Sequence, residues 1–127
     1  ALELIDAVGL SAFADVAAVN LPYGRKRALE IATTLAVDPE LMLLDEPTAG
    51  MGPEERWHMV DTVRRLWQST GLTVLFIEHD MDIVFSVAQD VTVLSYGAIL
   101  ARGAPAAVRA DPNVIQAYLG SYAKEAA

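Results

Sequence analysis

The sequence of 127 residues contains no cysteine. Disulfide bonds and thiolate metal sites are therefore excluded, and the absence of thiols suits a reducing compartment such as the cytosol. Positive charge is also scarce, with 9 lysines and arginines against 17 aspartates and glutamates and a net charge of −8. A general nucleic-acid binder would carry a basic stripe, whereas this chain has one basic cluster, Arg25 to Arg27. The composition therefore argues against nucleic-acid binding.

Long apolar runs are missing as well. No segment approaches the length of a membrane span, and residues 1–10 carry acidic side chains that a signal peptide would lack. Hydrophobic residues still make up 54% of the chain, which is ample for the core of one domain. We therefore expect any membrane association to come through a partner.

Two short apolar runs predict buried strands of a mainly parallel sheet. They are residues 41–44 and 72–77. Helical spacing predicts helices over residues 2–8, after Gly24, from Pro53 to Gly71, after Asp80, and in two short terminal pieces, the second capped by Asp111. Two further strands joined at Tyr96 and Gly97 are expected to close the sheet. The predicted fold class is α/β.

Acidic side chains and a histidine follow the two central strands. In open α/β sheets ligands bind beyond the carboxyl ends of the strands, and Asp45 and Glu46 stand there. Adjacent side chains leave a strand in opposite directions, so one carboxylate can face a metal and the other a water molecule. His79 follows the second strand, where it could donate to a phosphate or to attacking water. The alternatives are an acidic turn closed by Pro47 and a structural histidine.

A second feature is the basic start of the helix at Gly24. A helix N-terminus offers unpaired amides and a positive dipole end, and Arg25, Lys26 and Arg27 add charge suited to an anion such as phosphate. The alternative is a solvated basic turn with a capping glycine. Basic residues oppose the dipole at this end, which slightly favours an external anionic partner.

In order and spacing, these segments resemble the C-terminal half of the ATP-binding subunit of an ABC transporter. Residues 21–27 resemble the signature motif, residues 41–46 the Walker B strand with its catalytic glutamate, residues 48–53 the D-loop, and His79 the switch histidine. The form of the signature and the segments 77–81 and 117–120 look most like subunits that serve branched-chain amino acid uptake, a form shared by related amide or urea importers.

The resemblance implies a P-loop-NTPase-like, mainly parallel sheet with flanking helices, incomplete because the N-terminal half is absent. Residues 1–37 would end the helical subdomain with the signature helix, and residues 38–127 would form the Walker B, D-loop and switch part of the catalytic core.

The resemblance also implies roles for single residues. Asp45 would hold Mg²⁺ through water, Glu46 would orient or deprotonate the attacking water, and His79 would contact the γ-phosphate of ATP. Two sets of residues would face ATP held by a second subunit: the signature residues Leu21, Pro22, Tyr23, Gly24 and Arg25, and the D-loop residues Ala49, Gly50, Met51 and Gly52.

Four positions depart from the commonest form of the family. The usual serine, glycine and glutamine of the signature are Pro22, Tyr23 and Arg25, and the usual aspartate of the D-loop is Gly52. A hydroxyl contact to phosphate is thereby lost, and Arg25 could replace it in part by its charge.

A Walker A motif is absent altogether. The phosphate cradle requires G-x-x-x-x-G-K-[ST], and neither lysine of the chain, Lys26 or Lys124, stands in that pattern. We therefore expect a truncated subunit that does not hydrolyse ATP alone.

The sequence thus predicts part of the motor subunit of an ATP-driven importer, cytoplasmic and peripheral on the inner face of the bacterial plasma membrane. Its partners would be a second ATP-binding subunit, membrane permease subunits and, indirectly, a periplasmic substrate-binding protein. One alternative is a soluble ABC ATPase of translation or DNA repair. The other is a non-catalytic binding or regulatory module, against which the retention of Asp45, Glu46 and His79 speaks.

Overall fold

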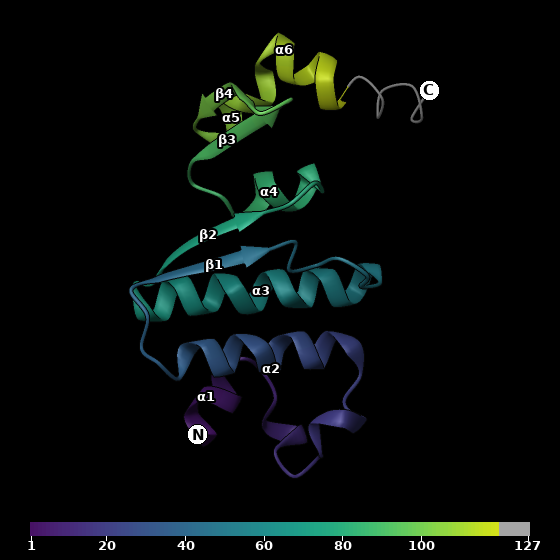
Figure 1. Cartoon of the computed structure of the whole chain (residues 1–127), viewed down its shortest axis with the longest axis vertical. Coiled ribbons are helices and arrows are strands. Elements are labelled where there is room, and N and C mark those ends of the chain that lie inside the picture. Colours follow the sequence, from purple (N-terminus) through teal and green to yellow (C-terminus); the bar gives the residue numbers. More distant parts are fainter. Residues whose placement is uncertain (120–127) are drawn as a thin grey trace. The chain divides into compact units, whose positions relative to one another are not determined.

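The computed structural model describes residues 1–119, and the chain divides into two compact units between His79 and Asp80. Each unit has its own two-stranded sheet (Figure 1). In the first unit β1 (Leu41–Asp45) pairs in parallel with β2 (Thr73–Ile77), and in the second β3 (Val91–Ser95) pairs antiparallel with β4 (Ala98–Gly103). The expectation that the hairpin closes a single sheet is therefore wrong. The predicted division at residue 38 stays a prediction, and part of the predicted segment 117–120 lies outside the described residues.

The first unit places helices on one side of its sheet. They are α1 (Leu2–Ala7), α2 (Tyr23–Leu35) and α3 (Pro53–Thr70), with short 3₁₀ turns η1 (Ser11–Phe13) and η2 (Ala18–Asn20) between α1 and α2. In Figure 1 the order is β2, β1, α3 and α2. Their buried side chains form one core, made of Val8, Leu10, Ala28, Ile31, Ala32, Met42, Met51, Met59, Val63, Leu66 and Leu72.

The bounds of α3 follow from local chemistry, as predicted. Pro53 occupies the first helical position, and the Glu55 carboxylate accepts a hydrogen bond of 3.3 Å from the amide of Gly52. Gly71 ends the helix in the left-handed conformation, with φ of 68°. The helix turns Val63 and Leu66 into the core, where both are buried.

The parallel strands are buried on one face only. Met42 points into the core and is 2% exposed. The opposite face, called the outer face below, carries Leu41, Leu43, Leu75 and Ile77, whose exposed fractions are 51%, 67%, 59% and 63%. In the described part of the chain the two strands are therefore buried on one face and exposed on the other.

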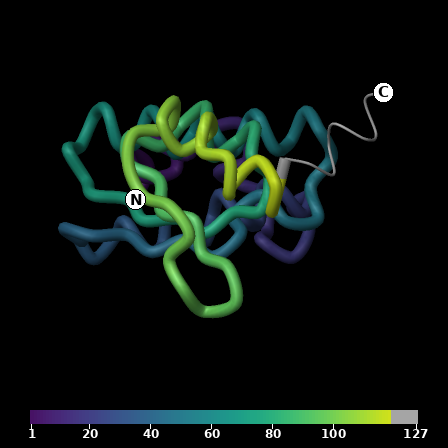
Figure 2. Tube along the Cα trace, turned by 90° about the horizontal axis from the view of Figure 1, so that it is seen from above, coloured from purple at the N-terminus to yellow at the C-terminus, as the bar shows by residue number. Residues whose placement is uncertain are grey.

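The second unit contains the β3–β4 hairpin and short helices. The hairpin turns at Tyr96 and Gly97, both with positive φ, as a two-residue hairpin turn requires, and Figure 2 shows it as a narrow green loop. The helices are α4 (Met81–Val87), α5 (Pro105–Ala110), α6 (Pro112–Val114) and a π-helical turn, η3 (Ile115–Leu119). Asp80 and Asp111 cap α4 and α6 with their carboxylates, and the second of these caps was predicted. Within residues 1–119 no helix is both long and apolar enough to cross a membrane.

Candidate functional site

The parallel register of β1 and β2 brings two predicted site residues together. Asp45 pairs with Ile77, so the residues that follow both strands emerge at the same edge of the sheet. The amide of Glu46 donates to the carbonyl of Ile77 at 2.9 Å, which extends the pairing by one residue. Glu46 Oε1 then lies 3.3 Å from His79 Nδ1. Since an ionised carboxylate only accepts hydrogen bonds, Nδ1 carries the proton in this contact and Nε2 is left for another partner.

The contact between Glu46 and His79 is long and open to solvent. The side chains are 45% and 74% exposed respectively. A solvent-exposed polar contact of this length contributes little energy by itself, so it does not hold the two side chains in place. An exposed carboxylate beside an imidazole is nevertheless well suited to receive a polar ligand from solvent.

Glu46 also has an unusual backbone. Its φ is 44°, in the left-handed region that residues with a side chain rarely adopt. The chain leaves the strand at this residue, and the amide of Ala49 closes the following turn on the carbonyl of Glu46 at 3.1 Å. Such strain gathers at functional sites, where surrounding contacts enforce it.

Buried Thr48 and half-buried Glu78 form a pair beside this turn. The amide and the hydroxyl of Thr48 both donate to Glu78 Oε1, at 3.0 and 2.5 Å. Thr48 is 4% exposed. Sequence reasoning gave Glu78 no role, and the signal that pointed to it was its place between the second strand and His79.

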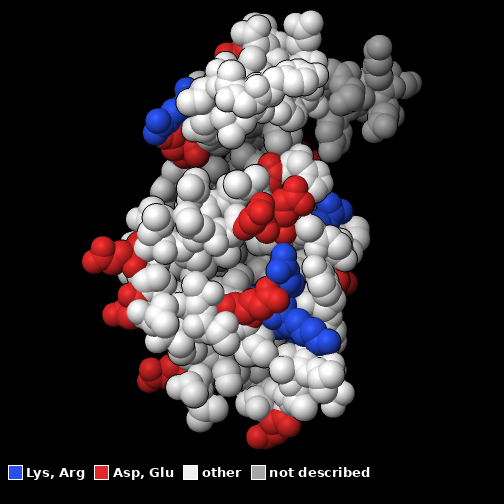
Figure 3. Space-filling view, in the orientation of Figure 1, with Lys and Arg blue, Asp and Glu red and all other residues white. Residues whose placement is uncertain are grey.

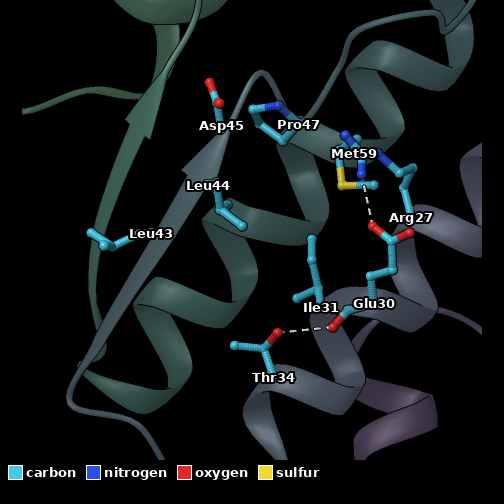
Figure 4. Close-up of a pocket in the computed structure, with 9 residues that line it drawn as sticks. All are labelled: Arg27, Glu30, Ile31, Thr34, Leu43, Leu44, Asp45, Pro47 and Met59. Carbon is cyan, nitrogen blue, oxygen red and sulfur yellow. Dashed lines mark hydrogen bonds and ion pairs between the residues drawn. The ribbon is translucent and has the colours of Figure 1, made fainter.

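Asp45 lies at the carboxyl end of β1, exposed, beside a hollow in the first unit. The hollow has a volume of about 270 Å³ and its lining includes Asp45, Leu43 and Pro47 together with residues of α2 and α3 (Figure 4). On its α2 side, Arg27 pairs with Glu30 at 2.8 Å. Within residues 1–119 no group of three or more histidine, cysteine, aspartate or glutamate side chains is arranged to hold a metal ion.

The start of α2 contacts the predicted D-loop. Tyr23 places its ring on Gly50, where a Cβ would lie 3.5 Å from Cε1 of the ring, and Gly50 has φ of 75°. Gly24 lies against Glu55, where a Cβ would stand 3.0 Å from the carboxylate. The structure therefore places the signature and D-loop segments side by side in one unit.

The remaining residues of these two segments differ in burial. Leu21 and Met51 are buried, at 7% and 8% exposed. Pro22 occupies the N-cap position of α2, where its side chain forms no capping hydrogen bond. Ala49 belongs to the turn after Glu46. Gly52 precedes α3 with ordinary φ of −67°.

Two of the three basic residues at the start of α2, Arg25 and Arg27, are engaged by neighbours within the first unit. The guanidinium of Arg25 lies over the Phe13 ring at 5.2 Å and donates to the carbonyl of Gly9 at 3.3 Å and to His58 Nε2 at 2.9 Å. Arg27 is paired with an acidic neighbour, as described above. Figure 3 likewise shows basic and acidic side chains interspersed on the face it presents.

Comparison with known proteins agrees with these features. A model of the family described as ABC transporter matches residues 1–49, and a model described as branched-chain amino acid ATP-binding cassette transporter matches residues 98–124. The chain is 41% identical to the high-affinity branched-chain amino acid transport ATP-binding protein BraF of Pseudomonas aeruginosa, covering 94% of this chain and 47% of that protein. It is 40% identical to LivG of Escherichia coli, a protein of the same description, covering 91% and 46%.

Solved structures give the same result. The ADP conformation of MJ1267, an ATP-binding cassette of an ABC transporter, superposes with a TM-score of 0.81 at 30% identity, over 94% of this chain and 48% of that one. The structure of cbiO1 from Clostridium perfringens, part of the ABC transporter complex cbiONQ, superposes with a TM-score of 0.81 at 29% identity, over 90% and 45%. The chain thus spans about half the length of the relatives that it matches. It belongs to the ABC transporter ATP-binding family, where it resembles the C-terminal part of the subunits for branched-chain amino acid transport.

Proposed function

We propose that this chain supplies the water-activating and phosphate-sensing part of an ATP-hydrolysing subunit in an ABC importer for branched-chain amino acids or related amides. The single observation that carries the proposal is the contact between Glu46 and His79 at the carboxyl ends of adjacent parallel strands. The names of the similar transport proteins support the class of solute.

The proposed chemistry assigns one task to each side chain. Glu46 accepts a hydrogen bond from the attacking water, orients it toward the γ-phosphate of ATP and takes up its proton. His79 donates a hydrogen bond to the γ-phosphate from Nε2, the nitrogen that its contact with Glu46 leaves available. The exposure of both side chains supports access for the substrate.

A magnesium ion fits the residues present. Mg²⁺ keeps most of its water in proteins and is bound through one or two carboxylates together with substrate phosphates, and Asp45 offers one exposed carboxylate next to Glu46. When bound, the ion would neutralise the charge that develops on the phosphates. Asp45 would hold it through a water molecule.

The absence of a Walker A motif limits the chain by itself. Positioning supplies most of the catalysis in phosphoryl transfer, and without a phosphate cradle ATP is not held against Glu46. The proposed activity therefore requires a Walker A segment in addition to these 127 residues. A second ATP-binding subunit would face the segments 21–25 and 49–52, and permease subunits would hold the assembly at the inner face of the membrane.

The test is ATP hydrolysis by the purified chain alone and mixed with the Walker A half of a relative such as BraF. We expect negligible turnover by the chain alone, turnover in the mixture, and loss of at least a hundredfold of that turnover with Glu46→Gln, a size that general-base catalysis supports. Glu54→Gln, an exposed carboxylate on α3, is the matched control and should retain the rate.

Two results would contradict the proposal. A folded mixture without turnover would favour a non-catalytic module. Steady Mg²⁺-dependent turnover by the chain alone, abolished by Glu46→Gln, would show that the Walker A half is not required.

A further inference from the structure

We propose that Glu78 is a positioning residue that sets the geometry of Glu46 and His79 through its hydrogen bonds to Thr48. The catalytic meaning of this inference rests on the proposed function, whereas its structural content does not. Glu78 lies next to His79 in the chain, and Thr48 lies two residues after Glu46. The pair therefore links the two segments that carry the site.

Glu46 needs an external constraint. Its backbone is held in the left-handed region, with φ of 44°, and such a conformation persists only where the surroundings enforce it. On the strand side, the amide of Glu46 is fixed to Ile77. On the loop side, the fixed point is Thr48, which is bound to Glu78 through both its amide and its hydroxyl. Hydrogen bonds to Ile77 and Glu78, at and just after the end of β2, therefore fix the backbone on both sides of Glu46.

The pair of Thr48 and Glu78 is better shielded from solvent than the contact between Glu46 and His79. The hydroxyl bond is short at 2.5 Å, the amide bond has an ordinary length of 3.0 Å, and Thr48 is 4% exposed, so water competes little for either bond. Both go to the same oxygen of Glu78, while Oε2 is buried without a hydrogen-bond partner among the described residues. Loss of the Thr48 donors would therefore leave a buried carboxylate unsatisfied, and the loop would rearrange to solvate it.

The first arm of the test is nuclear magnetic resonance of the whole chain, without nucleotide. Thr48→Val keeps the shape of the side chain and removes the hydroxyl, and Glu78→Ala removes the acceptor. We expect both variants to speed hydrogen exchange of the Glu46 amide about tenfold, in line with the loss of one buried hydrogen bond, and to shift the ring signals of His79.

Conservative variants separate positioning from general stability. Thr48→Ser and Glu78→Gln keep a donor and an acceptor, and both should restore the ring signals of His79. Thr73→Val makes the same change at an exposed threonine of β2 and should leave them unchanged. If Glu78→Ala does not fold, Thr48→Val decides the question. A folded Thr48→Val variant with unchanged Glu46 exchange and His79 signals would overturn the inference.

The second arm measures turnover in the mixture with a Walker A half. Thr48→Val is expected to lower kcat about tenfold with KM for ATP within twofold, because positioning of the attacking water affects the transition state more than binding. A rise in KM with unchanged kcat would contradict the inference. Absence of turnover in the unsubstituted mixture would count against the proposed function alone, since the magnetic resonance arm decides the positioning role by itself.

Discussion

The guanidinium of Arg25 makes three contacts inside the first unit. It stacks on Phe13, and it donates to a carbonyl in the turn after α1 and to His58 on α3. Because arginine has no acceptor, His58 Nε2 receives this bond and must be unprotonated in it. Arg25, a residue of the predicted signature on α2, thereby connects the segment that contains Gly9 and Phe13 with α2 and α3.

Replacement of Arg25 should accordingly reduce stability. We expect Arg25→Ala and Arg25→Lys each to lower the free energy of unfolding by about 1–2 kcal/mol, because lysine keeps the charge but not the planar, forked group that stacks and donates twice. Chemical denaturation measures this. Arg27→Ala removes only an exposed pair with Glu30 and should stay within about 0.5 kcal/mol. A fully stable Arg25→Lys variant would show that charge alone matters at this position.

The turn after β1 could be placed from the sequence, whereas its internal contacts could not. Two adjacent carboxylates after an apolar run predicted that Asp45 and Glu46 follow a strand, and His79 was predicted to follow another. The structure shows that these strands are parallel neighbours, which places His79 next to Glu46. The bond between Thr48 and Glu78 joins residues 30 apart in the chain, and no local pattern specifies such a pairing.

At the scale of elements, the ends of α3 were predictable because single residues set them. Proline at the first position and glycine after the last act through backbone conformation, which is a local property. The exposure of β1 is set differently, by which other elements are present to cover it. A run of leucines indicates a strand covered on both faces, but coverage depends on which other elements pack there.

Gly71 gives a test of this local control. Its φ of 68° disfavours any side chain, and a Cβ there would meet no atom within 4 Å, so a substitution has only a backbone effect. Gly71→Ala is expected to lower the free energy of unfolding by about 1 kcal/mol. Gly52→Ala, also without atoms nearby but with φ of −67°, should cause no loss. Equal melting temperatures for the two variants would contradict this account.

Asp80 gives the corresponding test at a helix start. Its carboxylate accepts hydrogen bonds from the amides of Asp82 and Ile83, at 3.1 and 3.4 Å. Asp80→Ala should destabilise the chain by about 1 kcal/mol, while Asp80→Asn, which retains the acceptor, should recover most of that loss. Thermal unfolding followed by circular dichroism distinguishes the two, and an Asn variant as unstable as Ala would argue against the cap.

At the scale of the whole molecule, the outer face of β1 and β2 governs behaviour in solution. Four large apolar side chains on a two-stranded sheet with open edges favour association. We expect the chain to self-associate with rising concentration in sedimentation experiments, and Leu43→Lys with Leu75→Lys to reduce association.

A matched substitution provides the control for association. Val37→Lys changes another exposed apolar residue, 78% exposed and outside the outer face, and should leave association unchanged. A monomeric unsubstituted chain at high concentration would contradict the expectation. Association that persists in the double variant would locate the contact elsewhere.

The left-handed backbone of Glu46 also affects how the protein responds to selection. Folded domains are stable by only about 5–15 kcal/mol, so a residue that strains its own backbone draws on a small reserve. Glycine adopts this conformation freely, and relief of strain would offset much of the entropy that glycine adds to the unfolded chain. A library screened for abundance alone would therefore tolerate Glu46→Gly, whereas a screen for transport would reject it. Disagreement between the two screens would identify this carboxylate without any structure.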